Sequence, residues 1–135
     1  MTRFWRGLFE GAQDPRHALG KRGEEEAARY LRKLGYEILE RNVRTRLGEI
    51  DLIARQRGVL VFVEVKTRSS GEFAPPELSV DGRKRRKLSA LAQAYLGGLG
   101  EAVDCRFDVL GITLPSKKAT PLIRHIQNAF QIEPE

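Results

Sequence analysis

Two apolar runs separated by a short polar break constrain the fold of this chain most strongly. The first run ends at Ala54, the second begins at Val59, and the break between them contains Arg57-Gly58. Apolar segments joined by so short a polar break predict a β-hairpin. If Arg57-Gly58 is the turn, Gln56 pairs with Val59, and counting outward along both strands places Asp51 opposite Glu64.

Three polar side chains are expected on one face of this hairpin. Side chains alternate along a strand, so Glu64 and Lys66 share a face while the valines between them point the other way. Without a register slip Asp51 lies on that face too, with its Cβ roughly 5 Å from the Cβ of Glu64. Two carboxylates that close repel each other, and a cation between them would remove the conflict. The simpler alternative is a charge cluster on a solvated sheet face, because an Asp followed later by Glu-x-Lys is common by chance.

The oxygen donors of this hairpin suit a hard divalent cation. Mg²⁺ (or Mn²⁺) keeps several waters, so Asp51, Glu64 and the backbone carbonyl of Val65 would suffice together with a phosphate. A metal there can activate a water and stabilise charge at phosphorus. Lys66 would stand beside that water and stabilise the developing charge electrostatically. The hairpin therefore predicts phosphodiester hydrolysis as its chemistry.

Composition limits the class of protein and its partners. The chain has 135 residues, which suits one compact domain, and a formal net charge of +6, which favours a polyanionic partner without fixing one. Cys105 is the only cysteine, so no intrachain disulfide can form, as in a reducing cytoplasm. No apolar run reaches membrane-spanning length, so a cytoplasmic protein without a membrane partner is expected.

The order of the predicted elements indicates an α/β (α+β) domain. A helix is expected from about residue 17 or 19 to 34, followed by strands over 36–43, 49–56 and 59–67. A second helix is expected to begin near Asp81 and end before Gly97-Gly98, followed by a strand over 103–114 and an optional last strand over 122–126. This order, αβββαβ(β), predicts a mixed sheet of four to five strands flanked by helices. Residues 1–16 are expected to form a separate arm before one domain over 17–135.

Helical periodicity ranks the three consecutive acids of the first helix. The apolar positions 27, 28 and 31 lie three, four and seven residues after Glu24, so Glu24 points toward the sheet. Glu25 and Glu26 project to other sides. Glu24 either pairs with an arginine at the edge of the core or joins Asp51 and Glu64 around a metal.

Periodicity also separates the basic residues that begin the second helix. Lys84 precedes the apolar Leu88 and Leu91 by four and seven residues and is expected to point toward the sheet, while Arg85 and Arg86 point outward. Such a cluster is commonly a solvated charge run, and the alternative is contact with nucleic-acid phosphates. The candidate phosphate contacts are Arg83, Lys84, Arg85, Arg86 and Lys87, together with Arg44, Arg46 and Arg68 near the hairpin.

Three residues are not expected to take part in chemistry. His17 and His125 lie far apart and lack metal-ligand spacing, so each is interpreted as a surface or strand-end histidine. Cys105 has no neighbour that suggests nucleophilic catalysis, so a packed thiol is expected.

Several motifs together are typical of a known family. They are Gly20-Lys21-Arg22-Gly23-Glu24, Gly35-Tyr36, Ile38-Leu39-Glu40-Arg41-Asn42, Gly48-Glu49-Ile50-Asp51-Leu52-Ile53, Val61-Phe62-Val63-Glu64-Val65-Lys66-Thr67-Arg68, Lys84 with Leu88, Ala94-Tyr95-Leu96, Arg106-Phe107-Asp108-Val109 and Asn128-Ala129-Phe130. Over nearly its whole length after residue 16, the chain resembles the YraN-type family of uncharacterised bacterial proteins. That family is placed in the PD-(D/E)xK nuclease superfamily and is distantly similar to archaeal Holliday junction resolvases.

The resemblance implies a restriction-endonuclease-like fold and a set of roles. It implies metal ligands at Asp51 and Glu64, a catalytic lysine at Lys66 and a helix-borne acid at Glu24, with Ile50 where the superfamily name has proline. The implied function is a metal-dependent endonuclease acting on DNA, with branched or recombination and repair intermediates as candidate substrates. A junction-cutting enzyme of this kind would be a homodimer. The alternatives are a nucleic-acid-binding protein that keeps the nuclease fold without significant turnover, and a basic scaffold that binds proteins through the N-terminal arm.

Overall fold

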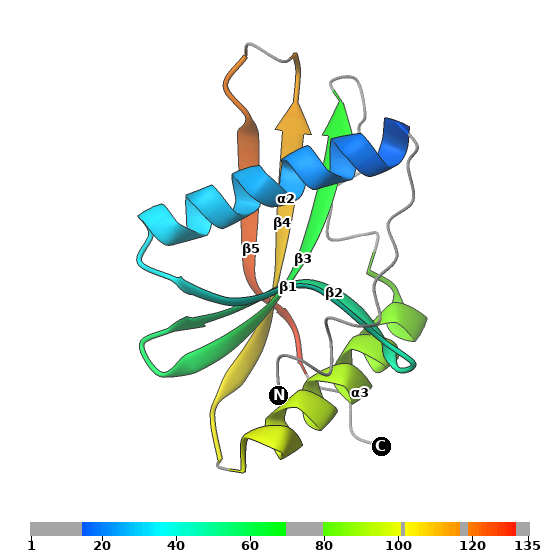
Figure 1. Ribbon diagram of the computed structural model, residues 1–135, viewed down its shortest axis with the longest axis vertical. Coiled ribbons are helices and arrows are strands. Elements are labelled where there is room, and N and C mark those ends of the chain that lie inside the picture. Colours follow the sequence, from blue (N-terminus) through cyan, green and yellow to red (C-terminus); the bar gives the residue numbers. More distant parts are fainter. Residues whose placement is uncertain (1–14, 70–79, 101, 117–118, 132–135) are drawn as a thin grey trace.

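Five strands form one sheet with a helix on each face (Figure 1). The computed structural model describes residues 15–69, 80–100, 102–116 and 119–131. Its elements are α2 (Pro15–Lys33), β1 (Glu37–Thr45), β2 (Gly48–Gln56), β3 (Val59–Ser69), α3 (Gly82–Leu99), β4 (Cys105–Leu114) and β5 (Leu122–Phe130). The order αβββαββ confirms the predicted fold class, includes the optional last strand, and is that of a restriction-endonuclease-like core.

The sheet is mixed, in the order β1-β2-β3-β4-β5. The neighbouring pairs β1–β2, β2–β3 and β4–β5 are antiparallel. Strands β3 and β4 are parallel, with partners from Leu60↔Cys105 to Ser69↔Leu114. A parallel pair needs a crossover connection, and α3 lies in it. The central strand β3 is therefore paired with β4 from Leu60 to Ser69, including the part that is not paired with β2.

The predicted hairpin register is confirmed. Gln56 pairs with Val59, and the pairing continues to Leu52↔Val63. Arg57 and Gly58 form the turn with φ of 51° and 80°. Two consecutive positive φ values are typical of the tight turns whose twist matches that of the strands they join.

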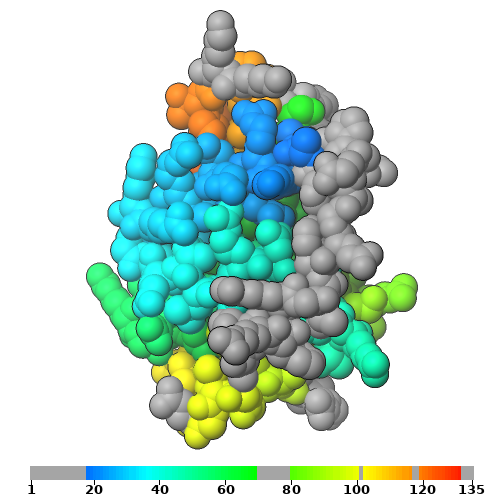
Figure 2. All heavy atoms as spheres, in the orientation of Figure 1, coloured from blue at the N-terminus to red at the C-terminus, as the bar shows by residue number. Residues whose placement is uncertain are grey.

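Two apolar cores cover the two faces of the sheet. Ala27 and Leu31 of α2 pack on the face that carries Leu52, Val61 and Val63. On the opposite face, α3 packs its residues Leu88, Leu91, Ala92 and Tyr95 against a cluster that includes Ile53, Phe62 and Phe107. Figure 2 shows α2 covering the upper part of one face, with α3 at the lower end of the molecule. Because side chains alternate along β3, its valines point toward α2 and the other face of the strand points toward α3.

Some boundaries differ from those expected. Helix α2 begins at Pro15, inside the predicted arm; the rest of that arm, residues 1–14, lies outside the described residues, as do residues 70–79 of the predicted loop. Helix α3 runs through Gly97-Gly98 and ends at Leu99, with Gly100 in the left-handed conformation at φ 73°. A glycine inside a helix costs only about 1 kcal/mol, which packing of the buried face can outweigh. No helix in the described ranges has the length and apolar character needed to cross a membrane.

Candidate functional site

The two strands of the hairpin separate where the predicted site begins. Regular pairing of β2 with β3 ends at Leu52↔Val63. Beyond it, the Asp51 carboxylate takes the place of a backbone acceptor, because the Val65 N–H donates to Asp51 Oδ2 at 2.7 Å. The N–H and C=O of one strand residue point to the same side, so the Val65 carbonyl also faces β2. Since β3 stays paired with β4 here, the sheet opens on one side only.

The carboxyl groups of Asp51 and Glu64 lie next to each other in this opening. Burial raises the pKa of Asp51 well above 3.8, and the charge of Glu64 and a hydrogen bond between the two carboxyl groups raise it further. The charge of Glu24 adds a smaller effect in the same direction, while the Val65 N–H opposes it. The charges of an acid on α2 and of an acid on β3 therefore both act on Asp51 of β2.

Two lysines approach the same oxygen of Glu64. Lys84 Nζ lies 3.1 Å from Glu64 Oε1, and Lys66 Nζ lies 3.9 Å from it. The Glu64 side chain is 8 % exposed and each lysine side chain 31 %, so the cluster is largely removed from water. Burial and the neighbouring amine of Lys84 lower the pKa of Lys66. Burial is the largest single influence on Lys84 and acts to lower its pKa, but the charges of Glu64 and Asp51 and the hydrogen bonds of Lys84 together raise that pKa overall.

The donor set fits a hydrated magnesium ion better than a closed metal cage. Within the described ranges, no three His, Cys, Asp or Glu side chains converge as a metal site would require. Asp51 and Glu64 offer oxygen donors, and two carboxylates suffice for an ion that keeps several waters. Close carboxylates that are at least partly buried also favour a positive charge nearby, which Lys84 and Lys66 supply here and a cation would supply as well. Glu24 acts on Asp51 through its charge and is not part of a three-ligand cluster.

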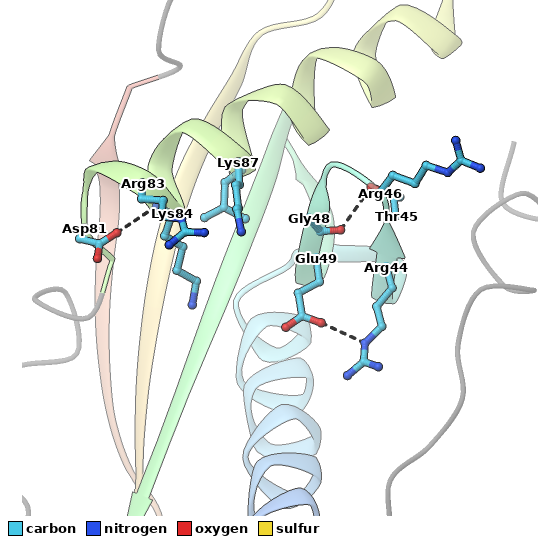
Figure 3. A pocket seen from close by; sticks show the side chains of 10 residues that line it. Arg44, Thr45, Arg46, Gly48, Glu49, Asp81, Arg83, Lys84 and Lys87 are labelled. Atoms are coloured by element: carbon cyan, nitrogen blue, oxygen red, sulfur yellow. Dashed lines mark hydrogen bonds and ion pairs between the residues drawn. The ribbon is translucent and has the colours of Figure 1, made fainter.

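A basic groove adjoins the carboxylates. It has a volume of about 820 Å³ and lies between the β1–β2 hairpin and the start of α3 (Figure 3). Five of its lining residues are basic and two are acidic; they are Arg44, Arg46, Arg83, Lys84 and Lys87, and Glu49 and Asp81. Lys84 lines the groove and also contacts Glu64, so this one side chain links the groove to the acids.

The start of α3 is fixed by its cap. Asp81, at the predicted start of the helix, is the N-cap, and its Oδ1 accepts a hydrogen bond from the Lys84 N–H at 2.9 Å. Such a bond satisfies one of the free amides at the helix start. The β1–β2 hairpin, which forms the other wall of the groove, lies close to α3, because a Cβ added at Gly48 would meet the Lys87 Cβ at 3.4 Å. The cap thereby sets the position from which Lys84 reaches β3.

The remaining predicted phosphate contacts have different surroundings. Arg85 does not point outward as expected, because its Nε donates to the Val80 carbonyl at 3.0 Å and its guanidinium lies 5.4 Å from the centre of the Phe130 ring. Arg86 is exposed, and Arg68 is partly buried near the end of β3. Arg44 pairs with Glu49 at 2.9 Å, inside the groove. Only some of the basic residues therefore face the groove.

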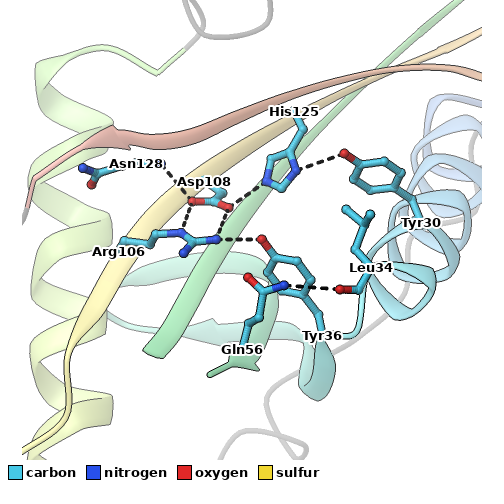
Figure 4. Close-up of polar contacts among 8 residues, drawn as sticks. All are labelled: Tyr30, Leu34, Tyr36, Gln56, Arg106, Asp108, His125 and Asn128. Atoms are coloured by element: carbon cyan, nitrogen blue, oxygen red, sulfur yellow. Dashed lines mark hydrogen bonds and ion pairs between the residues drawn. The ribbon is translucent and has the colours of Figure 1, made fainter. Parts of the chain in front are cut away.

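A buried polar network around Asp108 was missed from the sequence (Figure 4). Asp108 is completely buried and is bonded to His125 Nε2 at 2.7 Å, Arg106 Nε at 3.0 Å and the Asn128 N–H at 3.0 Å. Burial acts to raise the pKa of Asp108, but the hydrogen bonds from His125, Arg106 and Asn128 lower it overall. The interpretation of His125 as a surface or strand-end histidine is wrong, since its side chain is 7 % exposed.

This network joins strands to the helix on one side of the sheet. The Tyr30 hydroxyl of α2 lies 3.1 Å from His125 Nδ1, and Arg106 Nη2 donates to the Tyr36 hydroxyl at 2.6 Å. The spacing of Arg106 and Asp108 is the signal that could have found it, because residues two apart on a strand share a face. Its observed contacts join α2 and the start of the sheet at Tyr36 to β4 and β5.

The fold and the site define a class: an α/β core with an opened sheet, in which paired acids and lysines adjoin a basic groove. The model of the uncharacterised protein family UPF0102 matches residues 23–112. The chain belongs to this family of YraN-type uncharacterised bacterial proteins, which confirms the resemblance found from its motifs.

Relatives match over most of their length. A UPF0102 protein of Desulforamulus reducens is 48 % identical over 118 residues, which is 85 % of this chain and 97 % of that protein. One of Geobacter metallireducens is 47 % identical over 116 residues, covering 85 % and 93 % of the two chains. One of Symbiobacterium thermophilum is 50 % identical over 113 residues, covering 83 % and 95 %. The family name assigns no activity.

Proposed function

We propose that this protein is a metal-dependent endonuclease that hydrolyses phosphodiester bonds in DNA, with Mg²⁺ or Mn²⁺ as its cofactor. The observation that carries the proposal is the convergence of Asp51 and Glu64 where β2 leaves β3, with Lys66 and a basic groove beside them. The order of Asp51 and Glu64-Val65-Lys66 along the hairpin resembles the PD-(D/E)xK nucleases, which supports the same reaction class.

Asp51, Glu64 and the carbonyl of Val65 are the groups that would hold the cation. When bound, a divalent ion supplies a Lewis acid and a water of lowered pKa next to the scissile phosphate. The protein's own contribution is rigidity. The Val65 N–H fixes the Asp51 carboxylate, and β4 fixes β3 from the other side, so the donors are held before substrate arrives.

Lys66 is the catalytic lysine of this proposal. Lys66 lies on the face of β3 that carries Glu64, and its ammonium group is 3.9 Å from Glu64 Oε1. A cation in this largely dehydrated position stabilises negative charge on phosphate oxygens more strongly than it would in water. Lys66 is thus suited to stabilise the charge that develops as water attacks phosphorus.

The basic groove is suited to the polyanionic backbone of the substrate. Arg46, Arg83 and Lys87 line it from both walls, and the chain carries a net charge of +6. Contacts between such side chains and phosphates supply affinity without sequence specificity. Because Lys84 joins this groove to Glu64, a backbone bound there would pass close to the proposed metal ligands.

A cleavage assay tests the proposal. Purified protein is incubated with linear, nicked, single-stranded and four-way-junction DNA, with Mg²⁺ or Mn²⁺ or with a chelator. We expect metal-dependent cleavage that Asp51→Asn and Lys66→Ala abolish. Glu37→Gln is the control, because Glu37 pairs with Arg55 away from the site. Cleavage that survives Asp51→Asn would identify a contaminant. Salt-sensitive binding without cleavage would favour a binding protein with a nuclease fold.

A further inference from the structure

Lys84 is bonded to the carboxylate that the proposed cation needs. Its Nζ lies 3.1 Å from Glu64 Oε1, whereas Lys66 lies 3.9 Å from the same atom, so Lys84 makes the closer ion pair. A divalent ion at Glu64 would stand within a few ångströms of this ammonium group. Like charges at such a distance in a poorly hydrated site repel strongly. The ion and Lys84 therefore compete for the Glu64 carboxylate.

The groove offers Lys84 a second place to bind. Its side chain lines the groove together with Arg83 and Lys87, where phosphates are expected. The backbone of α3 need not move, because Asp81 caps the helix and a lysine side chain has four rotatable bonds. Rotation about those bonds can carry the ammonium group from Glu64 toward the groove.

From this geometry we propose that Lys84 is an exchangeable counter-ion: it neutralises Glu64 until a divalent metal displaces it, and it then binds a phosphate of the nucleic acid in the groove. This inference rests on the proposed function, since it assumes that Asp51 and Glu64 bind metal. It makes Lys84 a positioning residue that couples metal binding to substrate binding. A phosphate that holds Lys84 in the groove must therefore strengthen metal binding by the same factor by which the metal strengthens binding of that phosphate.

Metal affinity measured without substrate tests the exchange. Mn²⁺ binding to the full chain is measured by calorimetry and by the electron paramagnetic resonance of free Mn²⁺, for the wild type, Lys84→Met and Lys87→Met. Removing the competing ion pair is expected to tighten Mn²⁺ binding on the order of tenfold, the scale of one partly buried charge-assisted contact. Lys87→Met is the matched control, because Lys87 lines the groove without a contact to Glu64 among the described ion pairs, and should change affinity less than twofold.

A second measurement uses the wild-type chain and needs no variant. Reductive methylation of lysine amines, quantified by mass spectrometry, is compared with and without Mg²⁺ alone. The Lys84 amine should become several-fold more reactive when Mg²⁺ releases it from Glu64, while Lys87 should not change. Unchanged reactivity of Lys84 at saturating Mg²⁺, or Mn²⁺ affinity that is equal or weaker in Lys84→Met, would overturn the exchange.

A failure of the proposed exchange can be distinguished from a failure of the proposed metal site. If the wild type binds Mn²⁺ and Asp51→Asn or Glu64→Gln abolishes binding, the metal site of the proposed function stands, and only the Lys84 measurements decide the exchange. If neither the wild type nor Lys84→Met binds Mn²⁺, or if binding survives both carboxylate variants, the metal site itself is wrong and the exchange fails with it.

Discussion

Gly23 of α2 packs directly on Thr67 of β3: a Cβ added at Gly23 would overlap Thr67 Oγ1 and lie 2.7 Å from Thr67 Cβ. This close approach lies one residue from Glu24 on the helix and one residue from Lys66 on the strand. Only a residue without a side chain lets α2 come so near. The contact therefore fixes how far the helix, with its acid, stands from the carboxylates of the sheet.

Gly23→Ala is expected to destabilise the protein by about 1–3 kcal/mol, because the added methyl group overfills a packed contact. Gly20→Ala is the matched control, since Gly20 lies in the same helix and a Cβ there meets nothing within 4 Å. That control should be neutral or stabilise by about 0.5–1 kcal/mol through helix propensity. Urea unfolding measures both, and equal effects of the two changes would contradict the contact.

Asp51→Asn is expected to stabilise the fold by about 1 kcal/mol at neutral pH, as commonly found where a functional site holds like charges together. The raised pKa of Asp51 gives the sign: the native state holds its proton more tightly, so wild-type stability falls as the pH rises above 3.8 toward the folded pKa. The variant should lack this fall. Glu49→Gln, at an exposed pair with Arg44, should stay within about 0.5 kcal/mol. A destabilised Asp51→Asn in thermal melts without added metal would contradict the account.

Asp108→Asn is expected to cost about 3–5 kcal/mol, because it leaves the Arg106 charge without its buried partner. The pKa of Asp108 is lowered in the folded state, so its stabilisation is present above the unfolded value of 3.8 and is lost as the pH falls through the folded pKa. The variant should lose less stability on acidification than the wild type. Denaturant unfolding at several pH values measures this, with the exposed Asp104→Asn as control; identical pH profiles for wild type and Asp108→Asn would refute it.

Replacing Arg83 and Lys87 by alanine is expected to weaken DNA binding uniformly across sequences. The plot of log K against log salt concentration has a negative slope, and each lost phosphate contact should reduce the size of that slope by about 1. Fluorescence anisotropy of duplex DNA in chelator, at several salt concentrations, gives the slope. Arg29→Ala is the control, since Arg29 pairs with Glu26 on the exposed side of α2. A slope that falls equally in the control would place the DNA elsewhere.

The hairpin shows how much local pattern can predict. With Arg57-Gly58 taken as the turn within the polar break, the register and the approach of Asp51 to Glu64 followed by counting. Helical spacing likewise predicted that Lys84 reaches the sheet, where it pairs with Glu64. These features depend on residues close in sequence or on one strict period, so the sequence alone is sufficient.

Features that depend on tertiary packing were not predictable in the same way. Asp108 and His125 are 17 residues apart and meet only because β4 and β5 pair. Arg85 was expected outside by helical spacing, yet the end of β5 brings Phe130 under its guanidinium. The separation of β2 from β3 on the N-terminal side of Leu52 also left no mark in the apolar pattern, because Ile50 remains buried there.

The position of a bound metal tests the central claim most directly. A crystal of the full chain soaked in Mn²⁺ and measured near the manganese absorption edge gives an anomalous difference map. The account predicts one strong peak about 2.2 Å from carboxylate oxygens of both Asp51 and Glu64, with Lys84 Nζ moved away from Glu64. A map with no peak between these two carboxylates, or with its main peak at another site, would contradict it.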